Sequence, residues 1–230
     1  MRVCALGLAV CLTILVGTAA PARAEGSSGT WTGEIRIDDA RVYAGLGGPL
    51  LGTMPSGSPV QVQAWLPGPT LTSDNATWAD IGDGRFVHSS VLRRAPVGAV
   101  PRPPQIVSAH HWADVNLTQQ LLTLYDGPTP VRSTMMNAGR PGPDTATHSG
   151  VWPIFARVAN ETMVGADYYI TNVLYTQYFT ADGEAIHLNY WLNDDERGMP
   201  RSHGCVGLTY ADASFAWEFL SLGSLVYVHD

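Results

Sequence analysis

The sequence predicts a mainly β protein made of two small domains, with one prominent helix near the carboxy terminus. Short runs in which apolar and polar residues alternate recur along most of the chain, and Gly or Pro separates them. A Pro-rich stretch divides these runs into two groups. With 24 Gly and 16 Pro in 230 residues, the chain has few uninterrupted segments of helical length, which favours strands joined by turns.

The first residues are typical of a secretory signal peptide. Arg2 precedes an apolar run from Val3 to Val16, and small residues ending in Ala22-Arg23-Ala24 follow. The apolar run is shorter than the roughly 20 residues that a membrane-spanning helix needs. We therefore expect cleavage after residues 1–24 and export to the periplasm, the cell wall or the extracellular medium, with no membrane anchor in the mature protein.

Cleavage at this point decides which thiols remain. Cys4 and Cys11 leave with the signal peptide, so Cys205 is the one thiol expected in the mature chain. A lone cysteine in an exported protein is either a buried apolar residue or a nucleophile that avoids oxidative pairing. Lipid attachment at Cys11 is the less favoured alternative, because bulky Val10 precedes it and an apolar run follows where a polar tether is expected.

The mature chain is acidic. Removing Arg2 and Arg23 lowers the number of basic residues from 13 to 11, against 20 acidic ones, so the formal net charge is −9. No large cluster of basic residues offsets this charge. Nucleic acid is therefore not an expected partner, because binding to its phosphates depends on such clusters.

Residues 30–95 are predicted to form a small β barrel. Gly and Pro interrupt this segment at short intervals, and three alternating runs in it are typical of strands. These runs are Glu34–Ile37, Val60–Trp65 and Arg85–His88.

The order of motifs in this segment resembles a bacterial SH3-like domain. Ala40–Ala44 comes first, then a Gly-rich loop, Gly52-Thr53 before a turn, and Trp78–Ile81. The resemblance implies one of two roles, binding to cell-wall peptides or packing beside a catalytic domain, and both stay open.

A Pro-rich linker at 96–105 separates this domain from a second one at 106–230. Pro at four of these positions favours an extended spacer over packed structure. Strand patterns resume after it, and Asp126-Gly127 and Asp182-Gly183 indicate tight turns. The predicted strands include Ile106–Ser108, Leu121–Tyr125, Val151–Phe155, Tyr168–Phe179 and Leu225–Val228.

One helix is predicted before the last strand. Thr209 can cap its amino end, with Asp212 three residues later. Phe215 and Phe219 are four residues apart and so share a face, and Gly223 can end the helix.

The residues with catalytic potential lie just before this helix. Ser202-His203-Gly204-Cys205 occurs in a stretch rich in turn formers, and His187 lies upstream in a strand-like run. A thiol with an ordinary pKa of about 8.5 is mostly protonated at neutral pH, so acyl transfer requires a base and backbone N–H groups that hold the oxyanion. His187 can supply the base, and the amides of Gly204 and Cys205 can supply the N–H groups.

The spacing of these residues resembles the active-site signature of the YkuD-type L,D-transpeptidases. His187 is followed by fourteen residues and then by Ser202-His203-Gly204-Cys205-Val206. The similarity extends over nearly the whole second domain, from His111–Leu117 and Gln119–Tyr125 to the final strand, and the first two of these segments resemble the family's opening hairpin.

The resemblance implies a peptidoglycan enzyme of cell-wall biogenesis and cell shape that needs no cofactor or metal. Its cysteine attacks the third residue of a tetrapeptide stem, expels the terminal D-Ala and transfers the acyl group to a second stem, which forms a 3→3 cross-link. Carried over, Cys205 is the nucleophile, His187 the base, and the Leu188 carbonyl the group that orients the base. His203 and Ser202 shape the site, and Gly204 contributes to the oxyanion hole.

The sequence departs from the family pattern at three places. Gly207 stands where Asn or Arg is usual, which predicts the loss of a polar contact near the substrate. Leu188 replaces the Gly that often follows the base. Thr147–Trp152 keeps the Gly of the motif Thr-Pro-x-Gly-x-Phe but lacks its Pro.

Other interpretations of these residues are weaker. A metal site formed by His187, His203 and Cys205 has suitable ligand types but no paired-ligand motif. The acidic run Asp194-Asp195-Glu196 is more typical of a solvated loop than of a carboxylate site, although it can meet the amine of an acceptor stem. Two further functions stay open: an L,D-carboxypeptidase with the same site, and a non-catalytic wall-binding protein.

Overall fold

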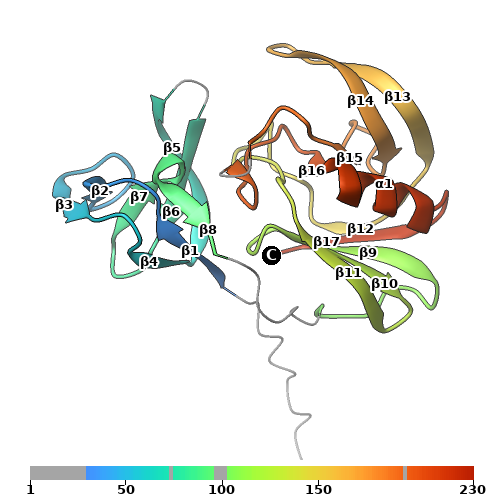
Figure 1. The fold of residues 1–230 in the computed structure, drawn as a ribbon, viewed down its shortest axis with the longest axis horizontal. Coiled ribbons are helices and arrows are strands. Elements are labelled where there is room, and N and C mark those ends of the chain that lie inside the picture. Colours follow the sequence, from blue (N-terminus) through green and yellow to red (C-terminus); the bar gives the residue numbers. More distant parts are fainter. Residues whose placement is uncertain (1–29, 73–74, 96–102, 194–195) are drawn as a thin grey trace, which may run out of the picture.

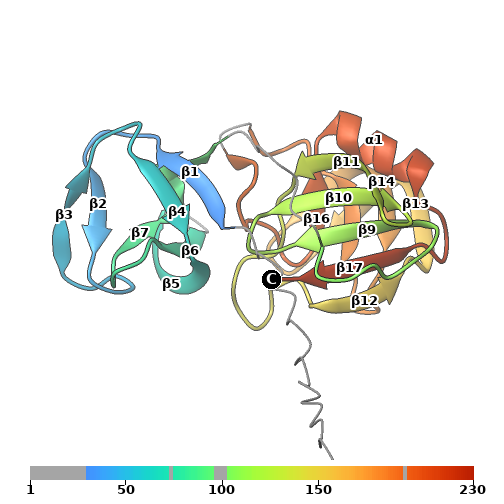
Figure 2. The ribbon, with the colours of Figure 1, turned by 90° about the horizontal axis from the view of Figure 1, so that it is seen from below.

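The computed structural model describes residues 30–72, 75–95, 103–193 and 196–230. Strands dominate it, which confirms the predicted mainly β fold. The strands form an N-terminal unit (residues 30–95) and a C-terminal unit (residues 103–230), which lie side by side in Figures 1 and 2. The predicted signal peptide, Cys4, Cys11 and most of the predicted linker lie outside the described residues, so their predictions stand as made.

Two sheets form the N-terminal unit around one apolar core. The smaller sheet has the strand order β4-β1-β8 and the larger one the order β3-β2-β7-β6-β5. Trp31, Ile35 and Leu92 are fully buried between them. This two-sheet arrangement is consistent with the predicted small barrel, and the SH3-like assignment remains a prediction. The elements are β1 (Trp31–Ile35), β2 (Ala40–Tyr43), β3 (Leu50–Met54), β4 (Pro59–Val62), β5 (Ala64–Thr72), β6 (Asn75–Asp80), β7 (Phe86–His88), the 3-10 helix η1 (Ser89–Val91) and β8 (Leu92–Arg94).

The C-terminal unit also has two sheets, with the orders β11-β10-β9-β17-β12 and β13-β14-β15-β16. All neighbouring strands are antiparallel except β15 with β16 and β17 with β9. The long β13–β14 hairpin projects beyond the rest of this unit in Figure 1. The elements are β9 (His111–Asn116), β10 (Leu121–Asp126), β11 (Thr129–Met135), β12 (Gly150–Pro153), β13 (Ala156–Val164), β14 (Tyr169–Tyr178), β15 (Ala185–Leu188), β16 (Val206–Leu208), α1 (Tyr210–Phe219) and β17 (Leu225–His229).

Helix α1 begins and ends close to its predicted limits. The Thr209 side chain accepts a hydrogen bond from the Asp212 N–H, which satisfies one of the unpaired donors at the helix start. The Phe215 and Phe219 rings stack with centroids 5.9 Å apart. The helix ends at the C-cap Leu220, and Gly223, with φ +85°, belongs to the following turn rather than to the helix end.

The prediction of a strand at Ile106–Ser108 is wrong. Among the residues that the structure describes, these three pair with no strand, and the Ile106 side chain is 50% exposed. A run of three residues contributes too few ladder hydrogen bonds to specify a strand unless a partner edge lies beside it. The predicted opening hairpin is present as β9 and β10, with Leu121 opposite Asn116. Among the described residues, no helix is long and apolar enough to cross a membrane.

Candidate active site

Two neighbouring parallel strands position the predicted base and the predicted nucleophile. His187 lies in β15 opposite Gly207 of β16, and Cys205 immediately precedes β16. Because side chains two residues apart on a strand point to the same face, Cys205 and a residue paired with Gly207 belong to one face of this sheet. The sheet register therefore brings together residues that are eighteen positions apart in the sequence.

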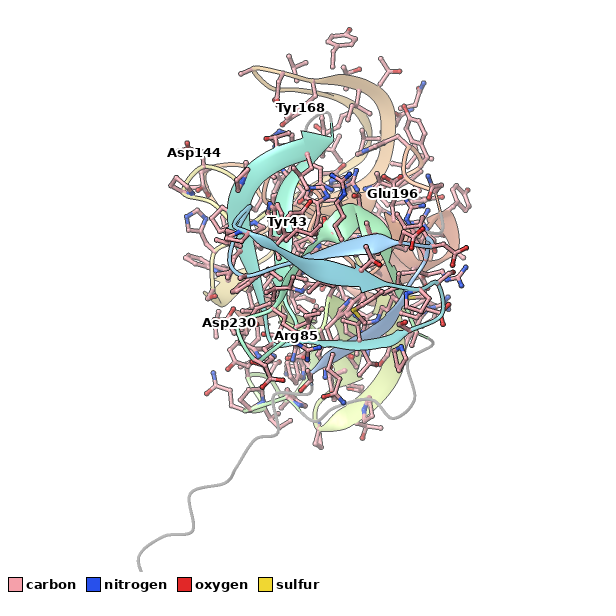
Figure 3. The ribbon with its side chains drawn as sticks, turned by 90° about the vertical axis from the view of Figure 1, so that its left-hand side faces the viewer. Tyr43, Arg85, Asp144, Tyr168, Glu196 and Asp230 are labelled. Atoms are coloured by element: carbon pink, nitrogen blue, oxygen red, sulfur yellow. The ribbon has the colours of Figure 1, made fainter. Side chains whose placement is uncertain are left out.

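His187 and Cys205 line the same pocket, which has a volume of about 260 Å³. The β13–β14 hairpin supplies the apolar wall on one side, and the segment after β15 supplies another wall. Figure 3 labels Tyr168, which lies at the end of the turn of this hairpin, directly before β14. The pocket is lined by Met163, Tyr168, Ile170, His187, Asn189, Trp191, Leu192, Arg201, Ser202, His203 and Cys205.

The protonation of His187 follows from its hydrogen bond. Its Nδ1 lies 2.8 Å from the Leu188 carbonyl oxygen, which can only accept a hydrogen bond, so Nδ1 carries the hydrogen and Nε2 carries the lone pair. The Trp191 ring stacks on the imidazole at a centroid distance of 5.8 Å. Burial lowers the pKa of His187 to about 4, against the smaller opposing effect of the Leu188 hydrogen bond. The imidazole is therefore neutral at neutral pH and can accept a proton at Nε2.

The Cys205 thiol is held in its neutral form. Burial raises its pKa to about 12, and the negative charges of Glu184 and Glu161 add to this increase, whereas a hydrogen bond from the Ala185 backbone opposes it. Its Sγ atom lies 3.7 Å from the Gly183 carbonyl oxygen, which can accept a weak S–H hydrogen bond. The residue as a whole is partly exposed and lines the pocket. The thiol can therefore be reached from the pocket, although protein atoms surround it.

Backbone and hydroxyl groups fix the loop that carries Cys205. Ser202 Oγ donates to the Cys205 carbonyl at 2.6 Å and accepts from the Gly204 N–H at 3.1 Å. Thr147 Oγ1 donates to the Gly204 carbonyl at 2.8 Å. Gly204 has φ +119°, a conformation that side chains rarely adopt, and an added Cβ would lie 3.1 Å from a Glu184 carboxylate oxygen. The shape of this loop thus depends on the Ser202 hydroxyl and on the glycine at position 204.

The Gly204 amide is the weaker of the two predicted oxyanion donors. Because its N–H already donates to Ser202 Oγ, it would have to share or exchange that bond to meet a substrate oxygen. The Cys205 N–H, adjacent to the attacking sulfur, is the other predicted donor.

His203 lies at the rim of the pocket, where it links the loop to the β13–β14 hairpin. Its Nε2 is 3.0 Å from a carboxylate oxygen of Asp167 and 2.7 Å from an Arg140 guanidinium nitrogen. A ring nitrogen either donates to Asp167 or accepts from Arg140, but not both at once. The Tyr168 ring packs against the imidazole at a centroid distance of 5.0 Å. This geometry gives His203 contacts that shape the rim of the site.

The structure changes the interpretation of Gly207. A Cβ added at this position would lie 2.8 Å from both Cβ and Nδ2 of Asn189. Asn189 is buried, and its side chain lines the pocket beside His187. Asn189, at the end of the neighbouring strand, thus places an amide-bearing residue in the pocket lining next to the position where Gly207 lacks a side chain. Sequence reasoning missed Asn189 because nothing in its local pattern indicates which residue it faces.

Glu184 and His148 form a second missed pair, behind the Cys205 loop. The carboxylate of Glu184 is buried and accepts hydrogen bonds from the His148 N–H at 3.0 Å and from His148 Nδ1 at 2.9 Å. Burial raises the pKa of Glu184, and the hydrogen bonds from His148 oppose that effect. The hydrogen bond to Glu184 raises the pKa of His148. The replacement of the family's Pro by His148 thus provides the donor for a buried carboxylate next to the nucleophile loop.

Two alternatives from the sequence remain, the acidic run at 194–196 and a metal site. Asp194 and Asp195 lie outside the described residues. Glu196 forms an ion pair with Arg201 at 2.9 Å, which is a partner within the chain. In the part of the chain that the structure describes, no group of three or more His, Cys, Asp or Glu side chains is arranged to hold a metal ion.

One protein-family model matches the part of the chain that contains this site. The family model YkuD, described as the L,D-transpeptidase catalytic domain, matches residues 110–228, which include every residue of the pocket. None of the curated proteins compared with the chain matches it.

Several solved structures are similar to this chain. An L,D-transpeptidase from Stackebrandtia nassauensis is 27% identical over 55% of this chain and 58% of its own, with a TM-score of 0.44. L,D-transpeptidase 3 from Mycobacterium tuberculosis, in complex with a faropenem-derived adduct, is 20% identical over 52% of this chain and 60% of its own, with a TM-score of 0.47. An L,D-transpeptidase from Mycobacterium smegmatis is 17% identical over 84% of this chain and 99% of its own, with a TM-score of 0.48. The chain thus spans less than two thirds of the length of the first two.

Proposed function

Because the chain belongs to the YkuD family of L,D-transpeptidase catalytic domains, we propose that it is a cysteine-dependent peptidoglycan L,D-transpeptidase that forms 3→3 cross-links between stem peptides. The observation that carries this proposal is the shared pocket of Cys205 and a neutral His187 whose Nδ1–H is fixed by the Leu188 carbonyl. That hydrogen bond leaves Nε2 as the proton acceptor.

The acylation step uses a neutral thiol and a neutral imidazole. With pKa values of about 12 for Cys205 and about 4 for His187, a preformed thiolate–imidazolium pair is disfavoured. The Sγ–H proton therefore moves to His187 Nε2 as Sγ attacks the carbonyl carbon of the third stem residue. The Cys205 N–H is the proposed hydrogen-bond donor to the developing oxyanion. When the tetrahedral intermediate collapses, the C–N bond to the terminal D-Ala breaks and His187 returns the proton to the leaving amine.

The second step reverses these roles. The side-chain amine of an acceptor stem attacks the thioester carbonyl, its proton passes to His187 Nε2, and the C–S bond breaks. The imidazole then returns the proton to the Cys205 sulfur. The apolar walls of Met163, Ile170 and Trp191 reduce the access of water, which favours an amine over hydrolysis. Water as acceptor would give an L,D-carboxypeptidase from the same acyl-enzyme.

The proposal includes the site of action. Stem peptides lie outside the cytoplasm, which agrees with the expected signal peptide and with export to the periplasm or the cell wall. For the N-terminal unit, the proposed SH3-like domain, the structure supports packing beside the catalytic unit through contacts such as Trp65 Nε1–H to the Thr118 carbonyl at 3.3 Å.

Covalent labelling tests the proposed nucleophile. Mature protein is incubated with a carbapenem, and the intact mass and the modified peptide are determined. We expect one adduct per chain, located on Cys205, no adduct in Cys205→Ala, and a strongly reduced rate in His187→Gln. Wild-type protein that stays unmodified, or an adduct elsewhere, would reject Cys205 as the nucleophile.

A further inference from the structure

A short segment directly upstream of the nucleophile loop crosses to the N-terminal unit. This bridging segment, Glu196–Arg201, leads into Ser202 and Cys205. Figure 3, viewed from the side of the N-terminal unit, labels Glu196 at its start. The bridging segment lies close to the nucleophile along the chain, because only three residues separate Arg201 from Cys205.

The N-terminal unit contacts this segment through the side chain of Met199. The Met199 side chain is 2% exposed and belongs to the core formed by Trp31, Ile35 and Leu92, although it comes from the other unit. It is the one residue of this core, among those the structure describes, that lies outside positions 30–95. An apolar side chain inserted into another unit's core cannot leave without opening a cavity there.

Two hydrogen bonds from the N-terminal unit flank Met199. The indole Nε1–H of Trp31 donates to the Gly198 carbonyl at 2.6 Å. Thr77 Oγ1 donates to the Pro200 carbonyl at 3.4 Å, from the buried face of β6. Gly198 has φ +74°, and a Cβ there would collide with the Arg94 side chain, so the segment approaches the N-terminal unit closely. Consecutive residues of the bridging segment are thus fixed by the same unit.

The C-terminal unit holds the opposite side of the segment. Asn137 Nδ2 donates to the Glu196 carbonyl at 2.6 Å and to the Met199 carbonyl at 2.8 Å. The Arg201 N–H donates to the Ala138 carbonyl at 2.9 Å. Asn137 also exchanges two backbone hydrogen bonds of 3.0 Å with Gly207, next to the base in the sheet. The same residue therefore links the bridging segment to the strand that follows Cys205.

From these contacts we propose that Met199 is a positioning residue, and that the N-terminal unit fixes the nucleophile loop in its reactive geometry by holding Met199 in its core. The N-terminal unit is then part of the active-site scaffold and not only a wall-binding module. The inference rests on the proposed function in so far as Cys205 is the reacting group. It does not depend on which acceptor the enzyme uses.

Four variants of the full mature chain separate this role from general stability. Met199→Ala removes the anchor, and Met199→Leu restores an apolar side chain of similar size. Met54→Ala is the matched control, since Met54 is a partly buried methionine that packs against the same core from β3 of the N-terminal unit itself. Thr77→Val removes one hydrogen bond with little change of shape and serves if Met199→Ala does not fold.

Two rates are measured well below the melting temperature: acylation of Cys205 by a carbapenem, and alkylation of Cys205 by iodoacetamide over a range of pH. In Met199→Ala, we expect carbapenem acylation to fall by about tenfold to a hundredfold, as for a small misplacement of a reacting group. We expect iodoacetamide alkylation to rise near neutral pH, because a loosened loop exposes the thiol to water and lowers its pKa. Met199→Leu should restore both rates, and Thr77→Val should change both in the same directions by less.

The outcomes are distinct. If Met54→Ala matches Met199→Ala in both rates, the effect belongs to the stability of the N-terminal unit and the positioning role is rejected. If Met199→Ala, or Thr77→Val in its place, reacts like the wild type, the role is likewise rejected. If the wild type resists the carbapenem while the substitutions still change alkylation and Met54→Ala does not, the proposed function fails and the positioning role stands.

Discussion

The Asn189 side chain occupies the space that a side chain at Gly207 would need. A Cβ at position 207 would lie 2.8 Å from Asn189 Cβ, closer than such atoms approach in proteins. Asn189 Oδ1 accepts a hydrogen bond from the Leu192 N–H at 3.3 Å, which orients the amide in the pocket wall. The small residue and the amide therefore depend on each other, and an exchange of the two residues tests that dependence.

Gly207→Asn should destabilise the protein and impair the site. Overpacking of a filled position costs about 1–3 kcal/mol. We expect thermal unfolding at a lower temperature and slower carbapenem acylation. The double variant Asn189→Gly with Gly207→Asn restores the total volume and one amide, so it should recover part of both losses. A single variant that behaves like the wild type would show that the Asn189 side chain is not fixed.

The free energy of unfolding should depend on pH because His187 is buried with a lowered pKa. Its pKa of about 4 in the folded chain lies below the ordinary value of 6.5, so between these pH values the unfolded chain binds a proton that the folded chain does not. The stability associated with the neutral imidazole is intact above about pH 6.5 and decreases as the pH falls toward 4. Urea unfolding at a series of pH values should therefore show that wild type loses stability relative to His187→Gln over this range. A constant difference between the two proteins would contradict the lowered pKa.

Glu184→Gln should make the thiol easier to ionise. The Glu184 carboxylate adds to the effect of burial in raising the pKa of Cys205, so its neutralisation lowers that pKa. Iodoacetamide alkylation of Glu184→Gln at a fixed alkaline pH should then be faster than that of the wild type. Glu218→Gln is the control, because it changes the net charge equally from helix α1. Equal alkylation rates in the two variants would mean that the Glu184 charge does not raise the pKa of Cys205.

The sequence predicts those parts of the fold and site that depend on local patterns. Thr209 and Asp212 predict the start of α1 because an N-cap bond joins residues three positions apart. His187 and Cys205 were predicted to share one site from the signature that their spacing resembles, and the register of β15 with β16 brings them together, because His187 pairs with Gly207, two residues after Cys205. Ile106–Ser108 was predicted as a strand on the same local grounds, and it is not one because none of the described strand edges pairs with it.

Contacts between distant residues could not be predicted in this way. His148 meets Glu184 across 36 positions, and Trp31 meets Gly198 across 167. Nothing in the sequence around Met199 indicates whether its side chain is buried in the core of its own unit or in the core of the N-terminal unit. Such contacts are set by how the sheets pack, which alternation and turn residues do not encode.

The most direct measurement of the central claim is mass spectrometry of the mature protein incubated with purified disaccharide-tetrapeptide, beside a Cys205→Ala control. We expect a cross-linked dimer that is lighter than two substrates by one released D-Ala, and no such dimer in the control. Tripeptide without dimer would contradict transpeptidation and indicate an L,D-carboxypeptidase. An unchanged substrate, or a dimer that Cys205→Ala also forms, would contradict a cysteine-dependent enzyme.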